Sequence, residues 1–335
     1  MNHRFKRALW LLLSFTLISC SGGKTSGDSS NTSNTLLDIA AKNNFTLFSQ
    51  AASKAEMNAT LSAAEANLTA FVPTDAAFNS LAQRLQWTDG SAMIAALPKE
   101  TLRRVLDYHL LAGLKKSTDL VSAGSTQETL FKQNTVAQTL KLNFTDGIHI
   151  TDAATTMSNV ITPNIVASNG LIHSIDRVLI PPGVFNLVQT IRIIPNLTKL
   201  STLLGSGNLA NPELDINGFI SGSTGYTIFA PTNSAFDGLK PDLTDLQLDK
   251  ILKSHILAGG RRVSELHQTA VDLLVSISGE KIYLVDGQNG LYLLSLQDQN
   301  NQINFISVDI LASNGVIHLT DKVLSPFPPS DSIYK

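Results

Sequence analysis

A stretch of fifteen residues occurs twice in this chain, and the repeat constrains the fold more than any other feature. Residues 167–181 read ASNGLIHSIDRVLIP and residues 312–326 read ASNGVIHLTDKVLSP, so ten of the fifteen positions are identical at an offset of 145. A repeat of this length indicates one folded unit that is used twice. The chain of 335 residues is long enough for two domains of ordinary size.

Two further blocks recur in the same order ahead of that stretch. Thr69–Phe78 (TAFVPTDAAF) matches Thr227–Phe236 (TIFAPTNSAF), and Leu106–Gly113 (LDYHLLAG) matches Leu252–Gly259 (LKSHILAG). The offsets are 158 and 146, so the first copy carries twelve extra residues between these blocks. We assign the insertion to the segment Gln86–Met93.

The first nineteen residues have the pattern of a signal peptide. Three basic residues lie within the first seven, and the apolar run 8–19 that follows is too short to span a bilayer as a helix. The chain's single cysteine, Cys20, ends the sequence LISC, which resembles the lipobox of bacterial lipoproteins. We therefore expect residues 1–19 to be removed and Cys20 to carry a lipid anchor that holds the protein at a membrane. The alternative is an ordinary signal peptide with a cysteine there by chance.

Residues 20–34 are rich in Ser, Gly, Asn and Thr and cannot bury enough apolar surface to fold, so they are expected to form a flexible tether. Ser21, rather than an aspartate, follows the cysteine. By resemblance to enterobacterial sorting, this favours the outer membrane of the bacterial cell envelope. The sequence leaves open whether the folded part faces the cell surface or the periplasm.

Composition narrows the classes of partner. The formal net charge is −2, whereas a nucleic-acid partner calls for a strongly basic surface. Hydrophobic residues make up 43% of the chain, which is ample for two cores. Beyond Cys20 no cysteine is left to form an internal disulfide, so each copy must be held together by its core.

Each block has a local structural meaning. The run ending at Pro73 predicts a strand that stops at the proline and turns into a helix capped by Thr74. The second block predicts a helix with His109 on its apolar face, ended by Gly113 in the usual C′ manner. Asn169-Gly170 predicts a two-residue hairpin turn.

Together these blocks resemble the fasciclin domain family. The Phe-x-Pro-Thr-x-x-Ala-Phe corner, the Tyr-His helix and the Asn-Gly-x-Ile-His ending occur here in the family's order, and residues 35–48 look like its first helix. The resemblance implies an α+β fold, a wedge of two β-sheets with helices packed along one side. It divides the chain into copy one (residues 35–182) and copy two (residues 184–326), followed by a C-terminal tail (327–335).

Several residues stand at positions of the family's motifs. We expect structural roles for the repeated positions: Pro73, Thr74, Phe78, Asn169, Gly170, His173, Pro231, Thr232, Phe236, His255, Asn314, Gly315 and His318. In animal members of the family a Tyr-His pair is associated with integrin binding. Copy one has Tyr108-His109 at this place, and copy two has Ser254-His255.

The candidate partner-binding residues are this Tyr-His pair and two dibasic pairs that occupy the same place in each copy: Tyr108, His109, Lys115, Lys116, Arg261 and Arg262. The alternative for the dibasic pairs is that they only compensate the negative end of the preceding helix. For His109 and His255 the alternative is a structural imidazole that hydrogen-bonds within the core.

No catalytic, metal-binding or cofactor motif accompanies these residues. We expect neither enzyme activity nor a cofactor. The leading hypothesis is an envelope lipoprotein that mediates adhesion or binds extracellular matrix, polysaccharide or a partner protein. The second hypothesis is a periplasmic accessory protein that binds an envelope component or polysaccharide. An enzyme whose site is assembled from distant residues is a remote third.

Overall fold

The computed structural model describes residues 34–205, 222 and 225–334. The leader 1–19, Cys20 and all of the expected tether except Asn34 lie outside these described residues. Among the described residues, no helix is both long and apolar enough to cross a bilayer.

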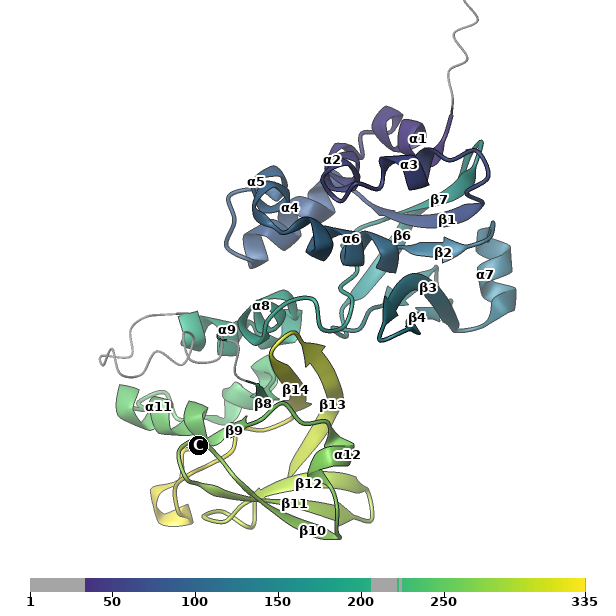
Figure 1. Ribbon diagram of the computed structural model, residues 1–335. Coiled ribbons are helices and arrows are strands. Elements are labelled where there is room, and N and C mark those ends of the chain that lie inside the picture. The colour runs from purple at the N-terminus through teal and green to yellow at the C-terminus, as the bar shows by residue number, and fades with distance from the viewer. Residues whose placement is uncertain (1–33, 206–221, 223–224, 335) are drawn as a thin grey trace, which may run out of the picture. The chain divides into compact units, whose positions relative to one another are not determined.

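Copy one is a seven-stranded sheet with most of its helices packed along one side (Figure 1). The strands run in the order β2-β1-β7-β6-β5-β4-β3, and only β1 and β7 pair in parallel. The strands are β1 (Leu68–Pro73), β2 (Leu110–Ala112), β3 (Thr126–Gln133), β4 (Val136–Asn143), β5 (His149–Thr151), β6 (Met157–Ala167) and β7 (Gly170–Ile175). The helices are α1 (Leu36–Lys42), α2 (Thr46–Lys54), α3 (Asn58–Ser62), α4 (Asp75–Arg84), α5 (Gly90–Ala96), α6 (Lys99–Tyr108) and α7 (Ser117–Ala123).

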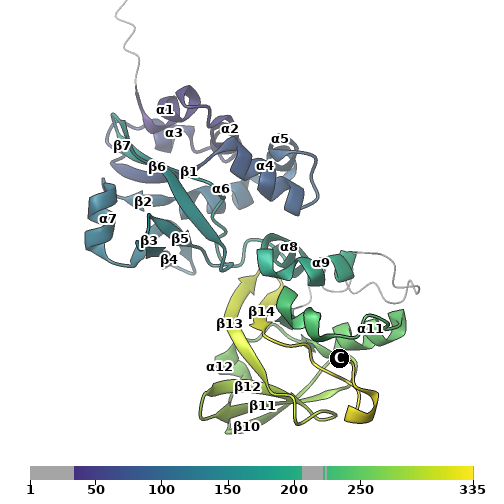
Figure 2. The ribbon, with the colours of Figure 1, turned by 180° about the vertical axis from the view of Figure 1, so that it is seen from behind.

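Copy two repeats this topology (Figure 2), with the strand order β9-β8-β14-β13-β12-β11-β10 and with β8 and β14 as the parallel pair. The strands are β8 (Tyr226–Pro231), β9 (Ile256–Ala258), β10 (Val271–Val275), β11 (Lys281–Gly287), β12 (Gly290–Ser295), β13 (Ile303–Ala312) and β14 (Gly315–Thr320). The helices are α8 (Leu187–Ile193), η1 (Pro195–Leu197), α9 (Thr198–Gly205), η3 (Asn233–Gly238), α11 (Asp245–Ser254), α12 (Val263–Leu266) and η4 (Pro329–Asp331).

Strand β1 separates two cores within copy one. Every residue of β1 is buried, and because side chains alternate along a strand, its two faces serve different cores. Ala70 and Val72 pack with the helices, whereas Phe71 packs with apolar side chains of β3, β4 and β5. Strand β8 does the same in copy two, where Phe229 faces the sheet core. This two-sided burial confirms the α+β wedge.

The strand-to-helix corner confirms the role expected of Thr74. Strand β1 ends at Pro73, and the Thr74 hydroxyl accepts a hydrogen bond from the Ala77 N–H at 3.2 Å as the N-cap of α4. In copy two the corresponding Thr232 begins only a short 3₁₀ helix, η3. The sequence explains the difference, because Gly238 and Pro241 follow there and disfavour a continued helix.

The expected helix end at Gly113 is wrong in its position. Helix α6 already ends at Tyr108, and the short strand β2 lies between it and the glycine. The backbone at Gly113 has φ of +81°, and at Gly259 it is +85°, so both residues occupy the left-handed region that favours glycine. The left-handed conformation of the glycine was expected correctly. However, Gly113 follows a strand, β2, that is too short to be recognised in the sequence pattern.

The Asn-Gly pairs do more than turn a hairpin. Asn169 Oδ1 accepts a hydrogen bond from the Leu36 N–H at 2.8 Å, and its Nδ2 donates to the carbonyls of Leu61 and Ala63. Asn314 likewise accepts from the Leu187 N–H at 2.8 Å in copy two. The last hairpin of each copy therefore holds the start of its first helix.

The glycines of these pairs are required by close approach rather than by the turn. A Cβ added at Gly315 would lie 2.1 Å from the Tyr226 carbonyl oxygen and 2.8 Å from the Leu187 side chain. At Gly170 it would lie 2.6 Å from the Leu68 carbonyl oxygen. In both copies the parallel strand pair and the first helix meet where only a glycine fits.

The residues after Pro326 pack against copy two. Ile333 is buried together with Leu239, Ile251 and Val323, and Tyr334 forms a β-bridge with Leu239. The segment expected as a tail thus contributes side chains to a small core beside α11.

We predict that Gly315→Ala lowers the free energy of unfolding by about 3 kcal/mol, because backbone and core must shift to admit the methyl group. The matched control is Gly279→Ala, at φ of +82° with no atom near the added Cβ. It should cost only the backbone strain, about 1 kcal/mol. Urea unfolding of both variants tests this, and equal losses would contradict the close-approach argument.

Candidate functional site

The dibasic loop of copy one is held at its backbone by two buried side chains. The Thr69 hydroxyl accepts from the Lys115 N–H at 2.8 Å and donates to the Gly113 carbonyl at 2.6 Å. His173 Nε2 lies 2.9 Å from the Lys115 carbonyl oxygen. The loop between β2 and α7 is thus fixed from β1 and from β7.

Copy two repeats this arrangement. The Thr227 hydroxyl accepts from the Arg261 N–H at 2.9 Å and donates to the Gly259 carbonyl at 2.7 Å. His318 Nε2 lies 3.1 Å from the Arg261 carbonyl oxygen. We call each of these sets, Thr69 with His173 and Thr227 with His318, the loop clamp.

A bulge in the neighbouring strand contacts both the loop and the histidine of the loop clamp. Asn164 and Asp309 have positive φ, +63° and +61°, where β6 and β13 shift register. Asn164 Oδ1 accepts from the Ser117 N–H at 2.9 Å, and Asp309 Oδ1 accepts from the Val263 N–H at 2.8 Å. The same two residues direct their own N–H groups at Nδ1 of the clamp histidines. The bulge contact was not predicted from the sequence, because the two equivalent positions carry different residues, Asn in copy one and Asp in copy two.

Burial lowers the pKa of both clamp histidines, His173 and His318. Their rings are neutral, with Nε2–H donating to the loop carbonyl and Nδ1 accepting the strand N–H, a tautomer assigned from these partners. Both imidazoles therefore act as structural hydrogen-bonding groups.

The two members of each dibasic pair differ in exposure. Lys115 and Arg261 are half-buried, and Lys115 Nζ donates to Gln127 Oε1 at 2.7 Å. Lys116 and Arg262 are exposed, each at the N-cap of the next helix. A helix N-terminus is its positive end, so compensation of a negative helix end does not explain these charges.

The Tyr-His pair of copy one is in the core. Tyr108 is 0% exposed, its hydroxyl donates to the Thr139 carbonyl at 2.9 Å, and its ring meets Phe131 edge-on. Burial also raises the pKa of Tyr108, so the phenol stays protonated. A partner cannot contact this side chain while copy one is folded.

His109 and His255 make identical contacts in the two copies. His109 Nδ1 lies 2.7 Å from the Val105 carbonyl oxygen, and Nε2 accepts from the Leu179 N–H at 2.9 Å. His255 bonds to Ile251 and Leu324 in the same way. Each imidazole ties its helix to the segment that follows the last strand, which favours the structural alternative for these histidines.

The described residues bring no metal-binding set together. No group of three or more His, Cys, Asp or Glu side chains within them could hold a metal ion. Asp176 and Asp321 accept the backbone N–H groups of Asn159 and Asn304 at 2.7 Å. Asp176 follows β7 and bonds to β6, and Asp321 follows β14 and bonds to β13, so both carboxylates fasten the last hairpin of their copy.

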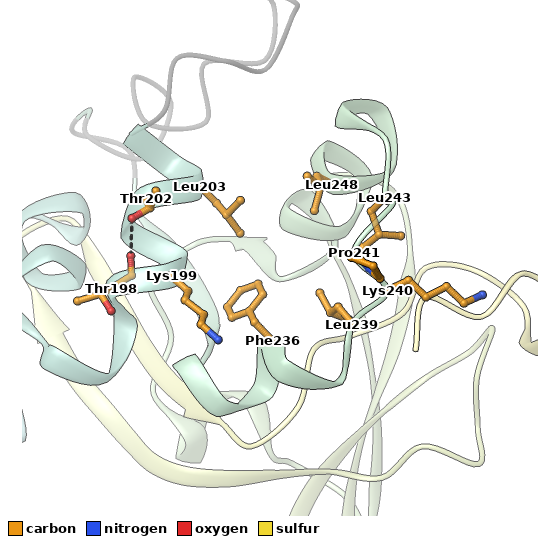
Figure 3. A pocket seen from close by; sticks show the side chains of 10 residues that line it. All are labelled: Thr198, Lys199, Thr202, Leu203, Phe236, Leu239, Lys240, Pro241, Leu243 and Leu248. Carbon is orange, nitrogen blue, oxygen red and sulfur yellow. Dashed lines mark hydrogen bonds between the residues drawn. The ribbon is translucent and has the colours of Figure 1, made fainter. Parts of the chain in front are cut away.

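Two apolar features of copy two were missed by sequence reasoning. One is a cavity of about 420 Å³ between α9, η3 and α11 (Figure 3). The other is the outer face of edge strand β10, where Val271, Leu273 and Val275 are exposed. The aligned edge of copy one has the polar Thr126 and Glu128 instead. Neither feature has a contiguous motif, since each is formed by residues that look like core residues in the sequence.

We predict that acid weakens the fold through His109 and His255. Burial lowers the pKa of each to about 4 from an ordinary 6.5, so on acidification the unfolded chain takes up the proton first. The stability each contributes is present above pH 6.5 and is lost as the pH falls toward 4. Between pH 7 and pH 5 each histidine should cost about 2 kcal/mol.

Urea unfolding of the whole protein at pH 7 and pH 5 measures this loss. His255→Gln should be less stable at pH 7 and should show a smaller loss between the two pH values. An unchanged loss in the variant would contradict the role assigned to His255.

Comparison with known proteins agrees with the repeated architecture. The family model described as "Fasciclin domain" matches residues 43–181 and again residues 195–326. A fasciclin-like arabinogalactan protein of Arthroderma benhamiae is 28% identical over 243 residues, covering 67% of this chain and 51% of the relative. Human periostin is 28% identical over 184 residues, covering 50% of this chain and 19% of periostin. The chain thus spans about half, or less, of the length of these curated relatives.

A solved FAS1 domain pair from the insect cell adhesion molecule fasciclin I aligns with a TM-score of 0.41 at 15% identity, covering 85% of this chain and 96% of the pair. The family matches span most of both copies, and each copy has the same wedge of strands and helices. The chain therefore belongs to the fasciclin domain family and carries two copies of the fasciclin domain.

Proposed function

We propose that this protein is a non-catalytic lipoprotein of the bacterial cell envelope that binds an extracellular matrix component, a polysaccharide or a partner protein. The observation that carries the proposal is the use of the repeated histidines. His109, His173, His255 and His318 are buried and hydrogen-bonded within the fold. These four repeated histidines thus serve the architecture in both copies.

The family supports binding as the kind of activity. The names of its relatives include an arabinogalactan protein and periostin, and the solved pair comes from a cell adhesion molecule. Whether this chain binds a polysaccharide or a protein is part of the proposal. Two linked copies raise avidity where both engage the same partner surface.

The loop clamp gives the proposal a location. It fixes the backbone next to Lys116 and Arg262, the exposed members of the dibasic pairs. A rigid loop with one exposed cation loses little conformational entropy on binding, so it suits contact with an acidic partner group. We place the partner contact on Lys116 and Arg262 rather than on the buried Tyr108.

A pair of charge reversals tests this location. Lys116→Glu with Arg262→Glu should weaken retention of the purified protein on acidic polysaccharide or matrix-coated surfaces at least tenfold, with no change in thermal unfolding. Lys42→Glu with Lys281→Glu, which changes the net charge equally at two exposed sites outside the loops, is the control. Equal losses in both double variants would show that only the overall charge matters.

The envelope location rests on Cys20 and on the leader, and Cys20→Ala tests it. The variant should leave the membrane fraction, because a single acyl-bearing residue is the proposed anchor. If the variant stays in the membrane fraction, the lipoprotein part of the proposal fails.

Protease treatment of intact cells then separates the two envelope roles. Loss of copy two without lysis would support adhesion at the cell surface. Protection until the outer membrane is breached would favour the periplasmic accessory role instead.

A further inference from the structure

The cavity of copy two is an apolar recess between helices. Its walls are the side chains of Leu203 from α9, Phe236 from η3, Leu239 from the loop that follows, and Leu243 and Leu248 before and in α11 (Figure 3). At about 420 Å³ it falls within the size range of ligand sites in proteins. Figure 3 shows these apolar side chains pointing into a common space from both sides.

Copy one has an equivalent place, and homologous hydrogen bonds define it. Asp75 Oδ1 accepts from the Leu47 N–H at 2.8 Å, and Asn233 Oδ1 accepts from the Lys199 N–H at 2.9 Å. Because Asp75 and Asn233 are equivalent in the repeat, α2 corresponds to α9. The repeat likewise pairs α4 with η3 and α6 with α11.

In copy one this place is filled by the inserted helix α5. Met93 and Ile94 of α5 are 1% and 3% exposed and belong to the helix core. Helix α5 packs against α2 and α4, so closely that a Cβ at Gly90 would lie 2.6 Å from the Leu47 side chain. The twelve extra residues of copy one therefore supply the apolar side chains that close the recess.

Copy two lacks the insertion. The residues equivalent to those that α5 covers in copy one are more exposed there. Phe78 and Leu102 are buried in copy one, whereas the equivalent Phe236 and Leu248 are half-buried. Ala51 is buried, whereas the equivalent Leu203 is half-buried. Among the described residues of copy two, no helix stands at the place that α5 occupies in copy one.

Two lysines line the recess, Lys199 and the exposed Lys240. Lys199, which lines the recess, forms an ion pair with Asp237. The inner wall is made by leucine, phenylalanine and proline side chains. An occupant must therefore bring apolar groups to the wall and keep its polar groups outside, as α5 does in copy one, where Ser91 and Ala95 are exposed.

We propose that the recess of copy two is a docking site for a short amphipathic helix of a partner protein, with two adjacent apolar side chains in the manner of Met93 and Ile94. This docking site goes beyond the proposed function. The recess can be occupied whichever side of the envelope the protein faces. It also lies outside the dibasic loops, so the two sites can be tested separately.

The chain itself supplies the probe. A peptide of residues 88–98, stapled between positions 91 and 95 on its exposed face to hold the helix, should bind the full chain saturably in fluorescence anisotropy. The same stapled peptide with Met93→Asp and Ile94→Asp should bind at least tenfold more weakly. Equal binding of the two peptides would overturn the proposal.

Two variants on one helix locate the binding. Leu248→Glu places a charge in the wall and should weaken peptide binding at least tenfold. Leu246→Glu, at a side chain that is 74% exposed on the same helix and outside the recess, should leave binding unchanged. Circular dichroism and thermal unfolding check that both variants fold.

Several outcomes would overturn the proposal. These are no saturable binding of the stapled peptide, binding that Leu248→Glu does not weaken, or binding that appears only after residues 206–221 are deleted, which would assign the recess to that segment. An apolar dye bound in the recess that the stapled peptide cannot displace would assign it to a small molecule instead.

Discussion

Each copy is closed on itself by one tight contact between its end and its beginning. The last hairpin places a glycine, Gly170 or Gly315, directly over a carbonyl of the first central strand and beside a leucine of the first helix. The asparagine before it, Asn169 or Asn314, bonds to the start of that helix. The parallel strand pair that divides the two cores depends on this approach, because it brings together segments about 100 residues apart.

Buried polar side chains make equivalent hydrogen bonds in both copies. Thr69 and His173 fix one loop, His109 fixes one helix to the segment after the last strand, and the second copy repeats these contacts. Buried polar groups must be paired, and here the pairing reproduces a loop of fixed shape.

Much of the fold could be predicted from the sequence because its signals are local. The strand that stops at Pro73, the Thr74 cap and the hairpin at Asn169 each depend on neighbours in the chain. The segment to which the insertion was assigned, Gln86–Met93, overlaps α5, which continues to Ala96. Gly113 was misplaced because a three-residue strand has no periodicity to detect.

The candidate site was harder to predict because it depends on burial. Tyr108 was a candidate partner-binding residue by resemblance, yet Phe131 and Thr139 from distant strands enclose it. The recess of copy two could not be predicted either. Leu203, Phe236 and Leu248 line it, but apolar residues at helical spacing are ordinarily predicted to be buried in a core. In the part of the chain that the structure describes, these side chains are half-buried where copy two is twelve residues shorter than copy one, and that difference leaves no signal at their own positions.

The loop clamp also has an evolutionary consequence. The bonds of Thr69 and His173 reach the loop through its backbone groups. Residue 116, and residue 262 in the duplicate, can therefore be exchanged without disturbing the architecture, because surface substitutions cost little. In a chain with two such loops, the exposed residue of one copy can change independently of its counterpart in the other copy.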